Sequence, residues 1–289
     1  MGRNSESLTY CDKALAINPM IPEVMLNRAS ALHFKNRFKE ALEQYLEISK
    51  KYPNSRLEEW GWILDCKISF FEWDEYENQV DAIISEIRTG ESPMPLVSLL
   101  NLTDDPEVHL LASRQRGETV NVAALSHHCL QKHNKIRIAY LSADFREHPT
   151  SYLMAGILEA HDHANFNVIG LSAKPPDKSP MSERVRTAFD QLHDISDLDD
   201  ANALDFVTSL EVDILVDLMG YTGFNRNRLV SMKPAPIIVN YLGFPSSIGS
   251  DRIDYILADH YLIPEVYEHN YDESIVYLPD CFQANDDKR

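Results

Sequence analysis

The chain of 289 residues is long enough for two domains, and its 44% hydrophobic and 25% charged residues are typical of a soluble globular protein. The formal net charge of −18, from 45 acidic and 27 basic residues, argues against nucleic-acid partners and against binding to an anionic membrane surface. No apolar run approaches the roughly 20 residues of a membrane span, and the amino terminus lacks the apolar segment of a signal peptide.

The four cysteines are scattered, with no C-x-x-C pair typical of a zinc or redox site. This spacing predicts reduced thiols and a cytoplasmic location rather than a disulfide framework. They are Cys11, Cys66, Cys129 and Cys281. The D-x-D motif at residues 197–199 precedes a predicted helix and is interpreted as a helix cap, so no metal site is predicted.

Residues 1–54 carry a 34-residue period, marked by Pro19 and Pro53. Each proline closes a helix-like segment, and the apolar residues between them form two helical stripes joined by a polar turn. Ala29 and Ala41 are small where two such helices would approach closely. This pattern resembles the tetratricopeptide (TPR) repeat and predicts about one and a half TPR-like repeats, with an ordinary helical hairpin as the alternative.

Residues 55–133 contain helical patterns without a repeat and are predicted to form a helical connector. Apolar residues recur at helical spacing from Trp60 to Phe71, and a second helix is predicted over residues 73–87. A further helix is expected after a capping Thr or Asp near residue 105. The aromatic residues of this region are interpreted as core.

From residue 134 onward, strand and helix patterns alternate, and the strands are nearly continuous apolar runs. This alternation is typical of a parallel sheet covered on both faces. The predicted strands are 136–141, 167–172, 213–218, 236–241, 255–258 and 274–277. The predicted helices are 151–161, 182–190, 202–210 and 226–232. Residues 134–289 are therefore predicted to form a Rossmann-like α/β lobe, without a G-x-G-x-x-G fingerprint.

The most informative stretch is residues 135–152, KIRIAYLSADFREHPTSY, in which a buried strand is followed by a polar turn and a helix. Pro149 suits the first helical turn, and Thr150 offers a capping hydroxyl. His148 is therefore expected just beyond the carboxyl end of a strand, at the start of a helix. Open α/β sheets bind ligands at that edge, and a helix amino end favours anions such as a diphosphate.

This stretch resembles the start of the catalytic region of the protein O-GlcNAc transferases, a family with TPR-containing, SPINDLY-like and bacterial members. The matching residues are Asp144-Phe145 and His148-Pro149-Thr150-Ser151. The resemblance continues through DILVDLMGYT (213–222), KPAPIIVNYLGFP (233–245), DYILAD (254–259) and YLP (277–279). These motifs occur in the family's order over about half of the chain.

The resemblance implies a GT-B fold, in which residues 134–289 would be the first Rossmann-like lobe. It also implies that the second lobe, which holds most of the nucleotide-sugar, is missing from this chain. The implied reaction is inverting transfer of N-acetylglucosamine from UDP-GlcNAc to serine or threonine hydroxyls of proteins, without a metal or other cofactor. The implied partners are acceptor proteins, bound through the TPR helices, and a second catalytic lobe.

Such a transfer requires proton removal from the acceptor, compensation of the diphosphate charge and in-line positioning. His148 is the candidate catalytic residue, because an imidazole pKa near 6.5 suits a general base; orientation of the sugar is an equal possibility. A histidine that only hydrogen-bonds a turn is the alternative. The substrate-binding candidates lie on loops after predicted strands or at the following helix, and they are Pro149, Thr150, Gly220, Tyr221, Thr222, Gly243 and Pro245.

Two of these loops have features of their own. Many bacterial relatives carry histidine where Tyr221 stands. Asp217, just inside the preceding strand, is expected to orient a neighbouring group, and Gly243 is expected to let backbone approach a ligand. Simple turn chemistry is the alternative for both loops.

Two other functions stay open from the sequence. One is a non-catalytic interaction module, in which the TPR helices and the lobe bind a partner. The other is a related glycosyltransferase that uses a different donor sugar, such as glucose or fucose.

Overall fold

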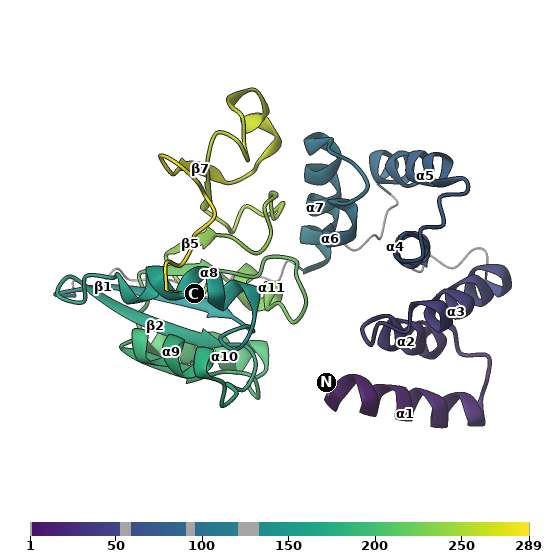
Figure 1. The fold of residues 1–289 in the computed structure, drawn as a ribbon, viewed down its shortest axis with the longest axis horizontal. Helices are drawn as coiled ribbons and strands as arrows, with labels where there is room; N and C mark the ends of the chain where they lie inside the picture. Colours follow the sequence, from purple (N-terminus) through teal and green to yellow (C-terminus); the bar gives the residue numbers. More distant parts are fainter. Residues whose placement is uncertain (1, 53–58, 91–95, 121–132, 289) are drawn as a thin grey trace. The chain divides into compact units, whose positions relative to one another are not determined.

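The computed structural model describes residues 2–52, 59–90, 96–120 and 133–288. The chain divides into two compact units, Met1–Ala112 and Ser113–Arg289. The first is built of helices and the second is an α/β lobe, as Figure 1 shows for each. Part of the predicted connector, residues 55–133, lies outside the described residues, and its boundaries stay a prediction.

The described part of the helical unit is a series of helices. Its helices are α1 (Gly2–Ile17), α2 (Pro22–His33), α3 (Phe38–Lys51), α4 (Glu59–Ser69), α5 (Tyr76–Thr89), α6 (Leu96–Leu99) and the start of α7 (Pro106–Val120). Successive helices α1 to α4 pack against their neighbours. The unit is therefore α-helical, and α1 to α3 are consistent with the TPR-like segment predicted over residues 1–54.

The predicted hairpin is formed by α2 and α3. Its turn includes Asn36 with φ 58°, a left-handed conformation that asparagine tolerates better than most residues. Ala29 and Ala41 are fully buried in one hydrophobic cluster with Leu32 and Tyr45. The two alanines thus lie in the hairpin core, where their small size was expected to matter.

Two aromatic residues of the second half of this unit are not core residues, contrary to the sequence interpretation. Phe71 is 80% exposed and Trp73 is 52% exposed. α4 ends at Ser69, Phe71 itself adopts φ 59°, and α5 begins only at Tyr76. The helical spacing of apolar residues in the sequence continues through this tight connection, but the chain there is not helical, so these side chains do not lie on the buried helix face. The side chain of Trp60 lies outside the described residues.

The lobe contains a parallel sheet of seven strands in the order β3-β2-β1-β4-β5-β6-β7. The strands are β1 (Ile136–Ser142), β2 (Phe166–Ser172), β3 (Gln191–Asp194), β4 (Ile214–Asp217), β5 (Ile237–Asn240), β6 (Tyr255–Ala258) and β7 (Ser274–Tyr277). The six predicted strands are confirmed to within about a residue. β3 was missed, because its sequence QLHD is a short, largely polar edge strand without an apolar run.

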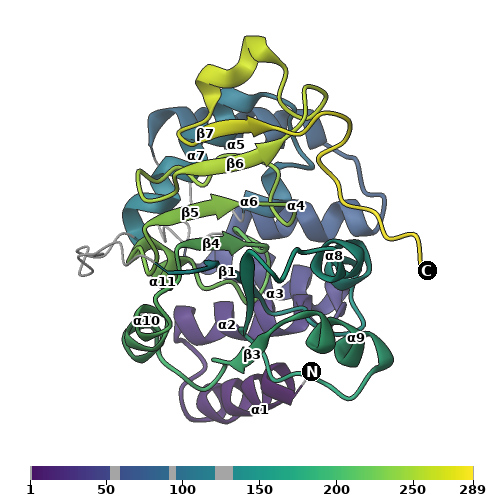
Figure 2. The ribbon, with the colours of Figure 1, turned by 90° about the vertical axis from the view of Figure 1, so that its left-hand side faces the viewer.

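Helices cover both faces of this sheet. α8 (Pro149–Glu159) and α9 (Pro180–Ala188) lie on one side, and α10 (Asp200–Ser209) and α11 (Asn227–Ser231) lie on the other (Figure 2). α8 and α9 begin two residues earlier than predicted, because a proline occupies the first turn of each. A short 3-10 helix, η1 (Glu265–Asn270), precedes β7. The fold is a Rossmann-like α/β lobe, the form of a GT-B half.

One hydrophobic core of the lobe lies between the sheet and the α8–α9 layer. Leu158 of α8, Val168 of β2 and Val185 of α9 are fully buried in it. Among the described cysteines, Cys11, Cys66 and Cys281 are free thiols; Cys129 lies outside the described residues. None of the described helices combines the length and the hydrophobicity needed to cross a membrane.

Candidate functional site

The sheet has a topological switch point between β1 and β4. The chain runs from β1 through β2 to β3 on one side and from β4 through β5 outward on the other. Because all strands are parallel, their ends form one edge, here called the carboxyl edge. The structure confirms that His148, Thr222 and Gly243 lie at this edge, after β1, β4 and β5. Open α/β sheets bind ligands at such switch points.

His148 is the N-cap residue of α8. Its backbone is extended (φ −153°, ψ 148°), and its ring Nδ1 accepts a hydrogen bond from the Thr150 backbone N–H at 3.3 Å. Nδ1 also lies 3.2 Å from Thr150 Oγ1 and 3.7 Å from Asp144 Oδ2. The imidazole thus takes the place of the Ser, Thr or Asp oxygen that usually caps a helix.

This geometry assigns the tautomer of His148. Partial burial lowers its pKa, opposed by the Asp144 carboxylate and aided by the charges of Arg146 and Lys174. The ring is therefore neutral near pH 7, and since Nδ1 accepts from a backbone N–H, the proton resides on Nε2. Nε2 has no partner among the described residues, so it is available as a hydrogen-bond donor.

Asp144 organises the loop between β1 and α8. Its backbone N–H donates to Ser142 Oγ at 3.0 Å, and its carbonyl accepts from Ser151 Oγ at 2.6 Å. Its carboxylate accepts from Arg146 Nε and Nη2 at 3.3 and 3.0 Å. These contacts hold the loop against the first turn of α8 and fix the backbone at His148.

Asp217 organises the loop after β4 from inside the lobe. Its carboxylate is fully buried and accepts from the backbone N–H groups of Met219 and Gly220 at 2.9 and 3.1 Å. Burial raises the pKa of Asp217 to about 6, although the two backbone donors oppose the shift. These hydrogen bonds are those of turn chemistry, the alternative interpretation of this loop, and orientation of a further group by Asp217 stays a prediction.

The hydroxyls of Tyr221 and Thr222 are used within the lobe. Tyr221 Oη donates to the Ile248 carbonyl at 2.9 Å, and Thr222 Oγ1 donates to the Met219 carbonyl at 2.8 Å. Burial raises the pKa of the Tyr221 hydroxyl well above its ordinary value. These donors shape the loop; their role in substrate binding stays a prediction.

Two glycines of this edge lie where a larger residue would clash with neighbouring atoms, which the sequence did not reveal. A Cβ on Gly243 would lie 2.1 Å from the carbonyl oxygen of Leu218, at the end of β4. A Cβ on Gly220, which has φ 53°, would lie 2.4 Å from Cβ of Phe244. Gly243 therefore lets the β5 loop approach β4. Ligand contacts of Gly220, Gly243 and the half-buried Pro245 stay predictions.

Two residues of the edge escaped the sequence reasoning, Arg146 and Lys174. Lys174 follows β2, and its Nζ lies 3.1 Å from the centroid of the Phe224 ring, on the loop after β4. The sequence could have indicated them, because both basic residues follow one of the first two predicted strands in a chain with far more acidic than basic residues.

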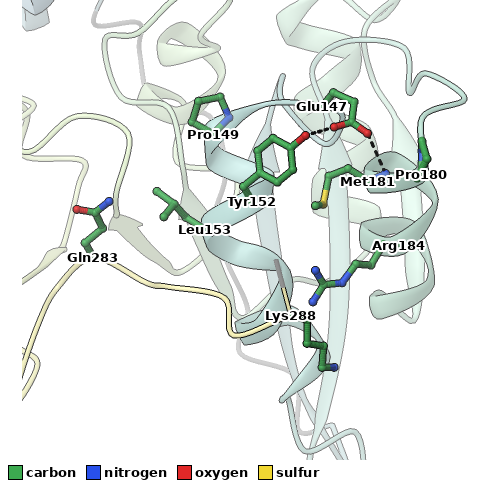
Figure 3. Close-up of a pocket in the computed structure, with 9 residues that line it drawn as sticks. All are labelled: Glu147, Pro149, Tyr152, Leu153, Pro180, Met181, Arg184, Gln283 and Lys288. Carbon is green, nitrogen blue, oxygen red and sulfur yellow. Dashed lines mark hydrogen bonds between the residues drawn. The ribbon is translucent and has the colours of Figure 1, made fainter.

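A cavity of about 730 Å³ lies beside this edge, between α8, α9 and the segment that follows β7. Figure 3 shows Glu147 bridging it, accepting from Tyr152 Oη and from the Met181 backbone N–H. Pro149 lines the cavity, whereas the His148 ring does not. At its far end Arg184 pairs with Glu159 and Asp286, at 2.7 and 2.6 Å. The cavity is thus a neighbour of the predicted site and not its centre.

No cluster of three or more His, Cys, Asp or Glu side chains suited to a metal ion occurs among the described residues. Asp199, in the D-x-D motif, caps α10, because its Oδ1 accepts from the Asn202 backbone N–H at 2.8 Å. The cap interpretation of this motif is confirmed.

Comparison with known proteins decides the family. The model of Glycosyl transferase family 41 matches residues 118–289, more than half of the chain. The chain belongs to this family. The solved structure of a mutant O-GlcNAc transferase from Thermobaculum terrenum matches with a TM-score of 0.72 at 22% identity, over 98% of this chain and 55% of that one, and shows the same fold.

Curated relatives match over about half of this chain. The probable UDP-N-acetylglucosamine–peptide N-acetylglucosaminyltransferase SEC of Arabidopsis thaliana is 34% identical over 155 residues, which cover 54% of this chain and 16% of the relative. The Caenorhabditis elegans UDP-N-acetylglucosamine–peptide N-acetylglucosaminyltransferase is 30% identical over 158 residues, covering 54% and 14%. The matched part of this family 41 member thus spans about a sixth of these relatives' length.

Proposed function

We propose that this family 41 chain supplies the first catalytic lobe of a protein O-GlcNAc transferase. It would transfer N-acetylglucosamine from UDP-GlcNAc to serine or threonine hydroxyls of proteins, together with a second lobe that completes the nucleotide-sugar site. Acceptor proteins would bind through the TPR-like helices, without a metal or other cofactor. A cytoplasmic location is supported by the free thiols of the described cysteines.

One observation carries the proposal. The β1–α8 motif that resembles the transferases lies at the switch point of the sheet, and it presents a histidine whose Nε2 has no partner in the described part of the chain. Similarity to relatives named as peptide N-acetylglucosaminyltransferases supports the donor and the acceptor class. The geometry favours this function over a pure interaction module, because a structural cap does not require imidazole.

Within this function, His148 acts as a hydrogen-bond donor that orients the sugar or the leaving group. The capping bond to Nδ1 places the proton of the neutral ring on Nε2. A ring in this state is a poor general base through Nε2, because that nitrogen has no free lone pair. Asp144 steadies the imidazole through the loop and does not reach Nδ1 closely enough for a good hydrogen bond, at 3.7 Å.

Reconstitution tests the proposal. The chain is mixed with the part of the Thermobaculum terrenum enzyme that it does not cover, and transfer of radiolabelled sugar to a serine-containing peptide is measured. UDP-GlcNAc is compared with UDP-glucose and GDP-fucose as donors. Transfer selective for UDP-GlcNAc is expected. If the bacterial enzyme's own first half restores transfer and this chain supports none with any donor, the proposal is wrong.

A further inference from the structure

Lys174 and Arg146 are two basic residues of the carboxyl edge; Arg146 belongs to the stretch 135–152, and Lys174 lies outside every sequence motif. Lys174 follows β2, and Arg146 follows β1, the neighbouring strand. The backbone before Lys174 is fixed to the end of β1, because the Ala173 N–H donates to the Ser142 carbonyl at 2.8 Å. The start of this β2 loop is therefore a defined part of the edge.

The side chain of Lys174 spans the end of β1. β1 lies between β2 and β4 in the sheet, and Nζ reaches from the β2 loop to the Phe224 ring on the β4 loop, 3.1 Å from its centroid. This is a cation–π contact. Partial burial and then the charge of Arg146 lower the pKa of Lys174, and the Asp144 carboxylate opposes this shift. Both cations lower the pKa of His148, which Asp144 raises. The three groups therefore share one electrostatic site.

The ammonium lacks a carboxylate partner. Among the described residues it forms no salt bridge, and the Asp144 carboxylate is held by Arg146. A partly buried cation has lost favourable interactions with water. An aromatic face replaces these interactions only in part, and a bound anion would replace the rest. Phe224, which holds the ammonium, is 54% exposed and adopts φ 63°, a strained conformation of the kind that gathers at functional sites.

We propose that Lys174 and Arg146 bind a diphosphate group at the carboxyl edge, next to His148. Arg146 uses Nε and Nη2 for Asp144, which leaves Nη1 for a ligand. Arg146 is paired with Asp144, so the uncompensated charge is that of Lys174. Together with Nη1 of Arg146 and the amino end of α8, it offers several N–H donors to a group with several anionic oxygens. That this group belongs to a nucleotide-sugar rests on the proposed function, whereas the anion site does not.

Titration of the full chain with inorganic pyrophosphate, followed by NMR shifts of backbone amides, tests the site. Saturable shifts are expected in residues 144–150, at Lys174 and at Phe224. Lys174→Met should raise the dissociation constant at least about tenfold, and Lys174→Arg should keep it within about threefold. Lys178→Met is the matched control, because Lys178 is an exposed lysine of the same loop, and it should leave binding unchanged.

Three results would overturn the assignment. Pyrophosphate could give no saturable shift, or the Lys174 and Lys178 variants could weaken binding equally, which would mean a diffuse charge effect. N-acetylglutamate could bind as tightly at the same ionic strength, which would assign the site to carboxylates. Because the titration needs no sugar transfer, its failure is separate from failure of the reconstitution.

Discussion

The loop after β1 and the loops after β4 and β5 lie side by side, yet they use their residues in opposite ways. In the β4 and β5 loops, Asp217, Tyr221 and Gly243 direct their polar groups or their small size toward the lobe itself. In the β1 loop, Nε2 of His148 and Nη1 of Arg146 have no hydrogen-bond partner in the described chain.

This difference distinguishes residues that hold the fold together from residues that can contact a ligand. A residue whose hydrogen-bonding capacity is used inside the fold is retained for shape, and its loss is expected to appear as lost stability. A residue with unused capacity at a switch point is expected to affect ligand binding first. The following substitutions test that division.

The largest expected effect on stability is that of Gly243→Ala. The new Cβ would lie 2.1 Å from the Leu218 carbonyl oxygen, a backbone atom that cannot move aside as a flexible side chain could. We expect the free energy of unfolding to fall by about 3 kcal/mol or more. Urea unfolding measures it, with Gly223→Ala as control, since a Cβ there meets nothing within 4 Å. Equal stability of the two variants would contradict the packing role.

Asp217→Asn should change how stability depends on pH. Burial raises the Asp217 pKa from 3.8 to about 6, so the folded state binds this proton more tightly than the unfolded state. The wild type should therefore lose up to about 3 kcal/mol relative to the variant as pH rises from about 4 to 7. Urea unfolding at both pH values measures this difference, and a pH-independent difference would refute the assignment.

The smallest expected effect on stability belongs to the β1 loop. His148→Ala removes the cap of α8 and should cost about 1 kcal/mol, because Thr150 N–H loses its acceptor. His148→Asn should stay within a few tenths of a kcal/mol of the wild type, since asparagine is a good N-cap. Thermal unfolding of the three proteins measures both. A loss near that of Gly243→Ala would place His148 with the scaffold.

The sequence carried much of this architecture. Apolar runs located six strands, and the helix patterns located the starts of α8 and α9 within two residues. The common edge of His148, Thr222 and Gly243 followed from parallel strands. The sequence could not show contacts between distant segments. Gly243 approaches Leu218 because β5 lies beside β4, and Lys174 reaches Phe224 because β1 lies between β2 and β4.

Sugar transfer by His148 variants, measured across pH, decides whether His148 acts as a hydrogen-bond donor to the substrate. In the reconstituted enzyme, His148→Ala should lower turnover by about 100-fold, as expected for loss of a placed donor. His148→Asn should retain most of the activity, because it keeps the cap and offers an N–H donor. Unchanged turnover in His148→Ala would remove the residue from the site. Equal losses in both variants, with loss of the acidic limb of the pH profile, would make His148 a general base and contradict the donor role.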